Sequence, residues 1–212
     1  MNDRIIDKDL LLIDSFKDKT RKSSYPLIKQ LAMQKVGKKN YNSLANIVDI
    51  DSKTVKNLLE ALENTELIFS IDSYESSASG ERKASEYYFL ATQIKAAYFI
   101  TNGDVSNDYR QYMGILLENL VATSLYKLQK NYNDGFGVYY DSRKGRVDFI
   151  IKSFNQKAVP IEVGIGKKNK KQITKAINKY NSDYGIVISN KTDYITKDEN
   201  VIFVPAITFS LI

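Results

Sequence analysis

The fold of the C-terminal half of this chain is indicated most clearly by two short stretches of sequence, GRVDFII at residues 145–151 and AVPIEV at residues 158–163. Both stretches consist mainly of β-branched, aromatic and other apolar residues, which is typical of buried β-strands. Each also carries one acidic residue, Asp148 in the first and Glu162 in the second. The polar residues between them are few, so the two strands are predicted to lie side by side.

The residues around these two strands complete an α/β domain over residues 106–212. Apolar residues recur at helical spacing after Tyr112, which predicts a long helix. A strand is predicted at residues 136–140, a second helix at 168–180, and further strands at 184–189 and 201–204. A helix, three strands, a helix and a strand in this order predict an α/β sandwich with a mixed central sheet.

The preceding part of the chain has a different pattern. Residues 27–32, 44–48 and 55–67 carry apolar residues at helical spacing, and residues 67–71 and 86–90 have the composition of strands. Three helices followed by a two-stranded hairpin are the order of a winged helix-turn-helix, predicted here for residues 23–105. Residues 1–22 alternate charged and apolar residues and predict an amphipathic helical lead-in. The predicted fold class is therefore α/β (α+β) with two domains.

The composition of the 212-residue chain excludes several kinds of chemistry. It contains no histidine and no cysteine, which excludes Cys/His zinc sites, thiol catalysis and every triad that needs histidine. Its formal net charge of +6 favours a polyanionic partner, although lysine-rich surfaces are also simply solvated. We find no apolar run of membrane-spanning length and no signal-peptide core after Met1. We therefore expect a cytoplasmic protein without a membrane partner.

Basic and polar residues on three predicted surfaces are candidates for contacts with DNA. The first surface is the start of the third helix, the second is the hairpin tip, and the third is a helix whose lysines repeat every four residues. Acidic residues such as Glu60 and Glu63 share the third helix, so a purely architectural role for the winged helix stays open. The predicted DNA-binding residues are Lys53, Lys56, Asn57, Arg82, Lys83, Lys171, Lys175 and Lys179.

The acidic residues in the strands predict a second kind of site. Burial of a carboxylate is costly unless a cation or hydrogen bonds compensate it. Asp148 and Glu162 on neighbouring strands, with Glu118 on the preceding helix, are predicted to converge like the ligands of a divalent metal ion. Oxygen ligands suit Mg²⁺ or Mn²⁺. The alternative is that Arg143, Arg146 or a lysine neutralises these acids.

Taken together, these motifs resemble the C-terminal region of a family of prokaryotic AAA-type ATPases, in which a winged helix precedes a PD-(D/E)XK nuclease-like (restriction-endonuclease-like) domain. The resemblance runs from about Asp9 onward. It implies that Asp148 and Glu162 bind the metal ion and that Glu118 assists. It also implies two partners, double-stranded DNA and an AAA-type ATPase domain in the same or a companion chain. The residues that carry it are Gly114, Glu118, Asn119 and the ranges 42–45, 53–55, 62–68, 139–140, 145–150 and 160–163.

The chain departs from that family at three points. Gly164 stands where the family has a lysine two residues after the second acid, and Lys167, Lys168 or Lys152 is a candidate to replace its charge. Arg146 stands where an acidic residue is usual. Residues 161–169 do not form a phosphate-binding loop, so no ATPase site is expected in this chain. Either an ATPase domain precedes it in a longer protein, or the chain is a standalone relative.

The expected function is that of a DNA-binding C-terminal part of an AAA-type ATPase, whose nuclease-like domain has lost its motif lysine. In this interpretation Glu118, Asp148, Glu162 and Lys167 are the candidate catalytic residues. One alternative is an active Mg²⁺-dependent DNA endonuclease. Another is a protein docking module without affinity for nucleic acid.

Overall fold

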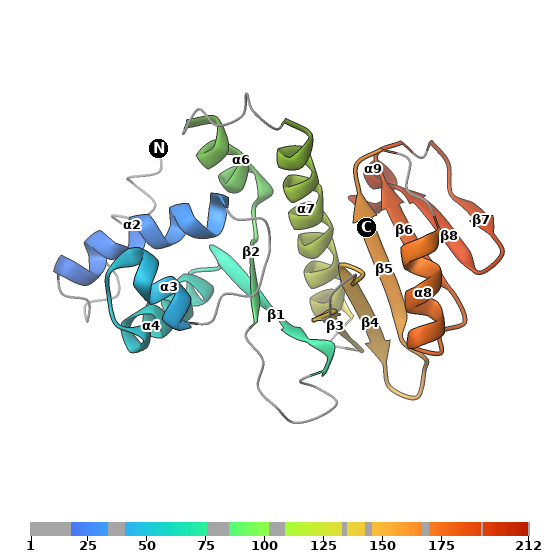
Figure 1. Cartoon of the computed structure of the whole chain (residues 1–212), viewed down its shortest axis with the longest axis horizontal. Helices are drawn as coiled ribbons and strands as arrows, with labels where there is room; N and C mark the ends of the chain where they lie inside the picture. The colour runs from blue at the N-terminus through green and yellow to red at the C-terminus, as the bar shows by residue number, and fades with distance from the viewer. Residues whose placement is uncertain are drawn as a thin grey trace.

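The computed structural model shows a mixed α/β protein with N-terminal helices and an eight-stranded mixed sheet (Figure 1). It describes residues 18–33, 41–75, 85–101, 109–132, 135–142, 146–166, 170–191 and 193–211, with side chains from residue 23 onward. The lead-in predicted for residues 1–22 therefore lies almost entirely outside the described residues. No helix within the described ranges is both long and apolar enough to cross a membrane.

The N-terminal part contains the predicted three helices and hairpin. The inner faces of the helices share one hydrophobic core, in which Leu27, Leu44, Val55 and Leu58 are fully buried. Burial of large apolar side chains stabilises such a small helical unit by about 2 kcal/mol per side chain. A further helix, which the sequence pattern did not predict, follows the hairpin. The elements are α2 (Asp18–Met33), α3 (Tyr41–Val48), α4 (Ser52–Asn64), β1 (Ile68–Ser73), β2 (Glu86–Phe89) and α6 (Thr92–Thr101).

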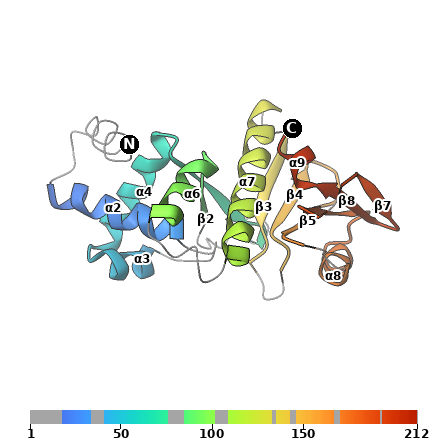
Figure 2. The same cartoon turned by 90° about the horizontal axis from the view of Figure 1, so that it is seen from above.

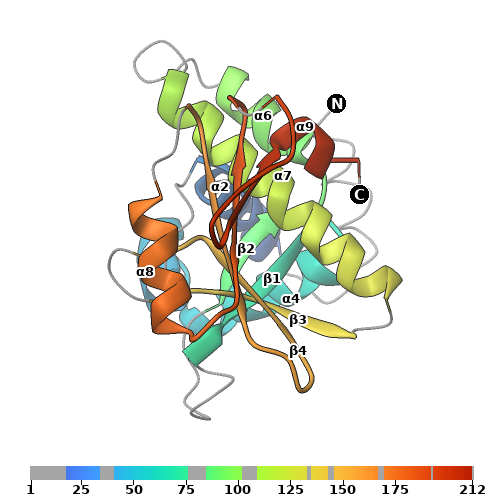
Figure 3. The same cartoon turned by 90° about the vertical axis from the view of Figure 1, so that its right-hand side faces the viewer.

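The C-terminal part follows the predicted order of helix, three strands, helix and strand, and adds two short elements near its end. The long helix α7 (Tyr109–Asn131) covers one face of the sheet, and α8 (Lys171–Lys179) covers the other, as Figures 2 and 3 show. The short final helix packs with the long helix. The elements are α7 (Tyr109–Asn131), β3 (Phe136–Tyr140), β4 (Phe149–Ser153), β5 (Val159–Gly164), α8 (Lys171–Lys179), β6 (Gly185–Ser189), β7 (Thr196–Asp198), β8 (Val201–Pro205) and α9 (Ala206–Phe209).

One sheet runs through both parts of the chain. Its strand order is β2-β1-β3-β4-β5-β6-β8-β7, so the N-terminal hairpin forms one end of the C-terminal sheet. β3, β4 and β5 pair antiparallel, whereas β5, β6 and β8 pair parallel. The junction between the two parts is the parallel pairing of β1 with β3, which involves only Asp72 with Tyr139 and Ser73 with Tyr140. The sheet is mixed, as the sequence predicts, but its extension by the hairpin was not predicted.

Asn119 of α7 bonds the hairpin to the long helix. Its side chain is fully buried. Its amide oxygen accepts a hydrogen bond of 3.0 Å from the backbone N–H of Phe89, and its amide nitrogen donates one of 2.8 Å to the carbonyl of the same residue. The hydroxyl of Thr123 donates a second bond to that carbonyl at 3.1 Å. The amide of Asn119 thus takes the place of a neighbouring strand along β2.

Replacement of Asn119 by alanine is expected to leave the buried N–H of Phe89 without its partner. We expect the free energy of unfolding to fall by about 1–3 kcal/mol, and the amide proton of Phe89 to exchange faster with solvent. Denaturant titration and hydrogen exchange measure these effects. Asn131→Ala, at the exposed end of the same helix, is the matched control. Equal stability of the two variants would contradict this role.

Candidate functional site

Charged and polar side chains gather where the hairpin, α6, α7 and the start of β4 meet. The hydroxyl of Tyr88 lies 3.2 Å from a carboxylate oxygen of Glu86 and 3.4 Å from one of Glu118. The guanidinium of Arg146 forms an ion pair of 2.7 Å with Glu86, which is almost completely buried. We call this group the buried charge cluster: Glu86, Tyr88, Lys95, Glu118, Arg146 and Asp148.

Asp148 enters the cluster because of its position at the beginning of β4. Its backbone N–H donates to the carbonyl of Ile161 at 3.0 Å, one position out of the register in which Phe149 pairs with Ile161. Its carboxylate accepts a 2.6 Å hydrogen bond from the backbone N–H of Val163. The side chain thereby continues the hydrogen bonding of β5 beyond the first residue of β4. The sequence placed Asp148 inside a strand, whereas the structure places it one residue before β4.

Burial and mutual repulsion set the protonation of the cluster. The pKa of Glu118 is raised to about 8, mainly by burial and also by the charges of Asp148 and Glu86, while the charges of Arg146 and Lys95 oppose the rise. Burial lowers the pKa of Lys95 to about 8, although the charge of Glu118 opposes that shift. Three carboxylates face two cations. A proton on Glu118 therefore makes the cluster neutral, which is the favourable state for buried groups.

Glu162 lies on the other face of the sheet. Its neighbours Ile161 and Val163 pack in the core below α7, so the alternation of a strand directs Glu162 toward α8. There its carboxylate accepts a 2.7 Å hydrogen bond from the side-chain amide of Gln172. Gln172 also bonds the backbone carbonyl of Arg146. Glu162 and Glu118 thus have different neighbours on opposite faces.

The structure accordingly brings together two of the three predicted acidic residues. Asp148 and Glu118 interact within the buried charge cluster, but Glu162 does not join them on that face. Within the ranges that the structure describes, no three acidic side chains are grouped so that they could hold a metal ion. The Mg²⁺ or Mn²⁺ site therefore stays a prediction: of its residues, Glu118 and Asp148 lie in the buried charge cluster, whereas Glu162 bonds Gln172.

Of the three lysines predicted to replace the motif lysine, the structure describes Lys152 alone. The ammonium of Lys152 donates to the carbonyl of Gln156, at the far end of the β4–β5 turn. Lys167 and Lys168 lie outside the described residues. Arg146, which the sequence suggested as a partner of Asp148, forms its ion pair with Glu86 instead. Arg146 thus neutralises a buried acidic residue, as the alternative interpretation of the sequence expected, but that residue is Glu86.

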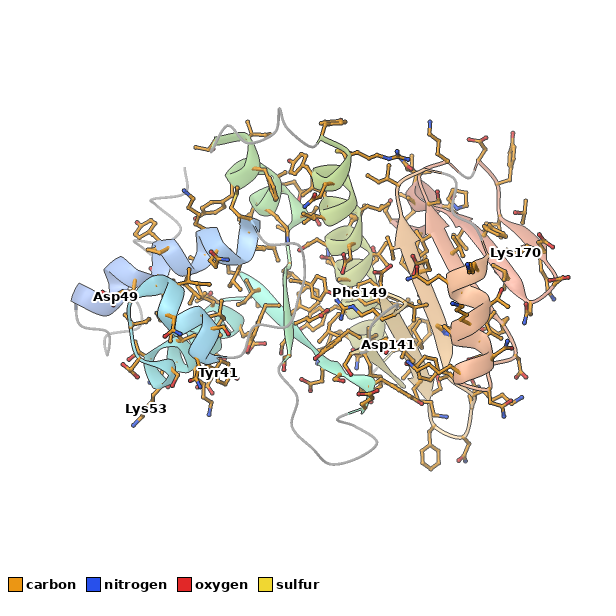
Figure 4. All side chains as sticks on the ribbon, viewed as in Figure 1. Tyr41, Asp49, Lys53, Asp141, Phe149 and Lys170 are labelled. Carbon is orange, nitrogen blue, oxygen red and sulfur yellow. The ribbon has the colours of Figure 1, made fainter. Side chains whose placement is uncertain are left out.

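The predicted DNA-binding residues fall on two separate surfaces. Lys53, Lys56 and Asn57 are exposed on the outer face of α4, where Lys56 lies 3.5 Å from Glu60. Figure 4 shows Lys53 and Lys170 toward opposite ends of the longest axis of the molecule. Arg82 and Lys83 of the hairpin tip lie outside the described residues.

The lysines of α8 differ in their surroundings. Lys171 and Lys175 are exposed. Lys179, by contrast, forms an ion pair of 2.9 Å with Asp141, whose side chain is only 2 % exposed. Lys170, just before the helix, forms ion pairs with Asp198 and Glu199. Two of the lysines at and just before α8 are therefore already paired with acidic residues of the same chain.

Sequence reasoning missed three residues of the buried charge cluster: Glu86, Tyr88 and Lys95. Lys95 had a usable signal, because it is the one charged residue in the segment IKAAYFI at residues 94–100. Glu86 and Tyr88 gave none, since their importance depends on contacts with residues 30 to 60 positions away.

Two family models match the chain in succession. Residues 3–99 match a model described as Domain of unknown function (DUF8612), and residues 113–209 match one described as Domain of unknown function (DUF4143). The two matches follow one another along the chain and do not overlap. Among curated proteins, it is 35 % identical over 205 residues to "Uncharacterized protein MJ1637" of Methanocaldococcus jannaschii. That match covers 97 % of this chain but only 42 % of the relative, so the chain spans less than half of the relative's length.

The raised pKa of Glu118 predicts how stability depends on pH. Folded protein keeps the Glu118 proton up to about pH 8, whereas unfolded chain releases it near the ordinary value of 4.5. The free energy of unfolding should therefore fall as pH rises from 4.5 to 8. Glu118→Gln should remove this part of the decline, as denaturant titrations across that range would measure. Glu60→Gln, on the exposed face of α4, should keep the wild-type profile. Parallel profiles for wild type and Glu118→Gln would refute the assignment.

Proposed function

We propose that this chain is the DNA-binding C-terminal part of an AAA-type ATPase. In this proposal a winged helix at the N-terminus contacts the duplex. The restriction-endonuclease-like domain that follows serves as a scaffold and does not cleave DNA. The observation that carries the proposal is the outer face of α4, where two lysines and an asparagine stand exposed above a fully buried inner face.

The geometry of α3 and α4 suits a helix that enters a groove. The two helices are joined by a short turn in which Asp49 has a φ of 53°. Asp51 caps α4, since its carboxylate accepts a 2.9 Å bond from the backbone N–H of Thr54. Val55, Leu58 and Leu62 anchor one side of α4 in the core. Lys53, Lys56 and Asn57 are consequently presented on the first turns, where recognition helices contact bases and phosphates.

Part of the positive charge at α8 is already paired within the chain. Lys179 and Lys170 already pair with Asp141, Asp198 and Glu199. Lys171 and Lys175 remain exposed and are candidates for secondary phosphate contacts. α4 is therefore proposed as the main contact, with α8 in a minor role.

The scaffold interpretation of the second domain rests on the acidic residues. Glu118 and Glu162 face opposite sides of the sheet, and Asp148 bonds the backbone of Val163. Gly164 stands at the position where the related nucleases have a lysine. Without a shared metal site or that lysine, the residues present would not activate water for phosphodiester hydrolysis.

The proposed link to an ATPase rests on the resemblance of the motifs and on relative length. MJ1637 extends well beyond the matched region, since that region is 42 % of it. More than half of such a protein is thus available for another domain. We infer an AAA-type ATPase domain as the partner, in the same or a companion chain.

Binding to a short DNA duplex should depend on the α4 lysines. Lys53→Ala combined with Lys56→Ala should weaken binding for all sequences and reduce the slope of log affinity against log salt by about 1 per lysine. Fluorescence anisotropy over a salt series measures both effects. Lys191→Ala with Lys197→Ala removes the same charge from exposed positions elsewhere and should change the slope little. Equal losses in both double variants would show that only net charge matters. An absence of binding at low salt, together with co-elution with an ATPase domain, would favour the docking module instead.

The scaffold interpretation predicts that the protein leaves supercoiled plasmid intact in Mg²⁺ or Mn²⁺. Gel electrophoresis of plasmid after incubation checks this expectation. Asp148→Ala and Glu162→Ala serve as controls for contaminating nuclease. Nicking by the wild type that disappears in both variants would overturn the scaffold interpretation and assign a metal-dependent endonuclease.

A further inference from the structure

The turn between β4 and β5 holds an aromatic ring in solvent. The backbone N–H of Gln156 donates to the carbonyl of Ser153 at 3.3 Å, and the ammonium of Lys152 donates to the carbonyl of Gln156. Asn155 has a φ of 58°, as the third residue of a tight turn often has. Phe154, the second residue of this turn, is 89 % exposed, more than any other large hydrophobic residue in the described ranges. The turn thus presents the ring away from the protein.

A second exposed ring stands close to this turn. Tyr132 follows the last residue of α7 and is 67 % exposed. The N–H of Gly135 donates to its carbonyl at 3.0 Å, which brings the two Cα atoms within about 7 Å of each other. Phe136 pairs with Ser153, and one step from this pair along each strand leads to Gly135 and Phe154, about 5 Å apart. The backbones of Tyr132 and Phe154 are therefore about 12 Å apart at most.

Lysines gather around the two rings, which we call the aromatic platform. They are Lys127 and Lys130 at the end of α7 and Lys152 and Lys157 on the two sides of the turn. Lys157 forms an exposed ion pair of 2.6 Å with Asp183, and pairs of this kind contribute little and exchange readily with other charges. Asp134, the other acidic residue near the platform in sequence, lies outside the described residues. The excess of lysine favours an anionic partner.

The type of exposed hydrophobic residue narrows the kind of partner. Within the described ranges, the exposed large aliphatic residues lie elsewhere, on α3, α6 and α9, next to β7 and after α9: Ile47, Ile100, Ile207, Ile195 and Leu211. Those of the platform are both aromatic. A membrane or a protein pocket accepts aliphatic side chains as well as rings, whereas the bases of a single-stranded nucleic acid stack on rings.

We propose that the aromatic platform stacks the bases of single-stranded DNA, with phosphate contacts from the lysines around it. A length of about 12 Å gives room for about three bases at the stacked spacing of about 3.4 Å. Figure 4 shows Lys53 of α4 toward the lower side of the molecule, and the turn between β4 and β5 reaches the same side in the identical view of Figure 1. This inference rests on the proposed binding of DNA and specifies its substrate class: a duplex that continues as a single strand.

A single tryptophan reports on the platform directly, because the chain contains no tryptophan. In Phe154→Trp, stacking should quench the indole fluorescence when oligothymidylate is added, and the quenching should decline as the salt concentration rises. Tyr194→Trp, at a position 79 % exposed beside β7, is the matched control and should not be quenched. Phosphatidylserine vesicles should leave both spectra unchanged. A spectral shift of Phe154→Trp with vesicles, or no quenching by oligothymidylate, would overturn the proposal.

The need for a ring is tested with two forms of DNA, a blunt duplex and the same duplex with an oligothymidylate overhang. By fluorescence anisotropy, the overhang should tighten binding to the wild-type chain by roughly tenfold, within the range known for base–aromatic stacking. Phe154→Tyr should keep this advantage. Phe154→Leu, which keeps an apolar side chain but no ring, should lose most of it. An equal advantage in Phe154→Leu and wild type would refute stacking.

The same measurements separate this inference from the proposed function. Lys53→Ala with Lys56→Ala should weaken binding of the blunt duplex and leave the quenching of Phe154→Trp unchanged. If the blunt duplex binds and the overhang adds nothing, the platform is refuted and the role of α4 stands. If oligothymidylate quenches Phe154→Trp but the blunt duplex does not bind, the role of α4 is refuted and the platform stands.

Discussion

A buried charge is tolerated only where its partners are buried with it, and this requirement joins the two parts of the molecule. Glu86 belongs to the hairpin and Arg146 to the sheet domain, yet they form one ion pair of 2.7 Å. Loss of either partner would leave an uncompensated charge in the interior, which typically costs 3–5 kcal/mol. Glu118 and Lys95 extend the same dependence to α7 and α6. The helices, hairpin and sheet therefore behave as one packed body.

This requirement also bears on the chemistry of the acidic residues. A carboxylate has about four lone-pair sites, so it can hold neighbouring groups in place whether or not it also binds a ligand. Asp148 accepts a bond from Val163, and Glu162 accepts one from Gln172 on the opposite face. The residue types of a nuclease-like site are thus present, but their hydrogen bonds serve the sheet and its covering helix. These hydrogen bonds are compatible with the proposed scaffold role in a chain that still carries the acidic residues of a nuclease-like motif.

Periodicity in the sequence predicted the helices α2, α3, α4 and α7 and the strands β3 to β6, because each signal lies within a few consecutive residues. It missed β7 and α9, which contain too few residues for a period to show, and α6, whose apolar residues do not gather on one face. The proximity of Asp148 and Glu118 was predicted from the sequence. The orientation of Glu162 toward α8 was not. The alternation of side chains along a strand predicts that Glu162 points to the face opposite to that of Ile161 and Val163. Which helix covers each face is known only from the tertiary structure. The bonds between Asn119 and Phe89 join residues 30 positions apart and leave no local trace.

The short junction of β1 with β3 has a consequence for how the protein folds. The helices and hairpin of the N-terminal part contact residues close in sequence, so they can form early and fast. The pairing of Asp72 with Tyr139 closes a loop of 67 residues for only two ladder positions. Chain entropy opposes that closure until α7 and β4 supply further contacts. We therefore expect the pairing of β1 with β3 to form late in folding, after both halves have largely formed.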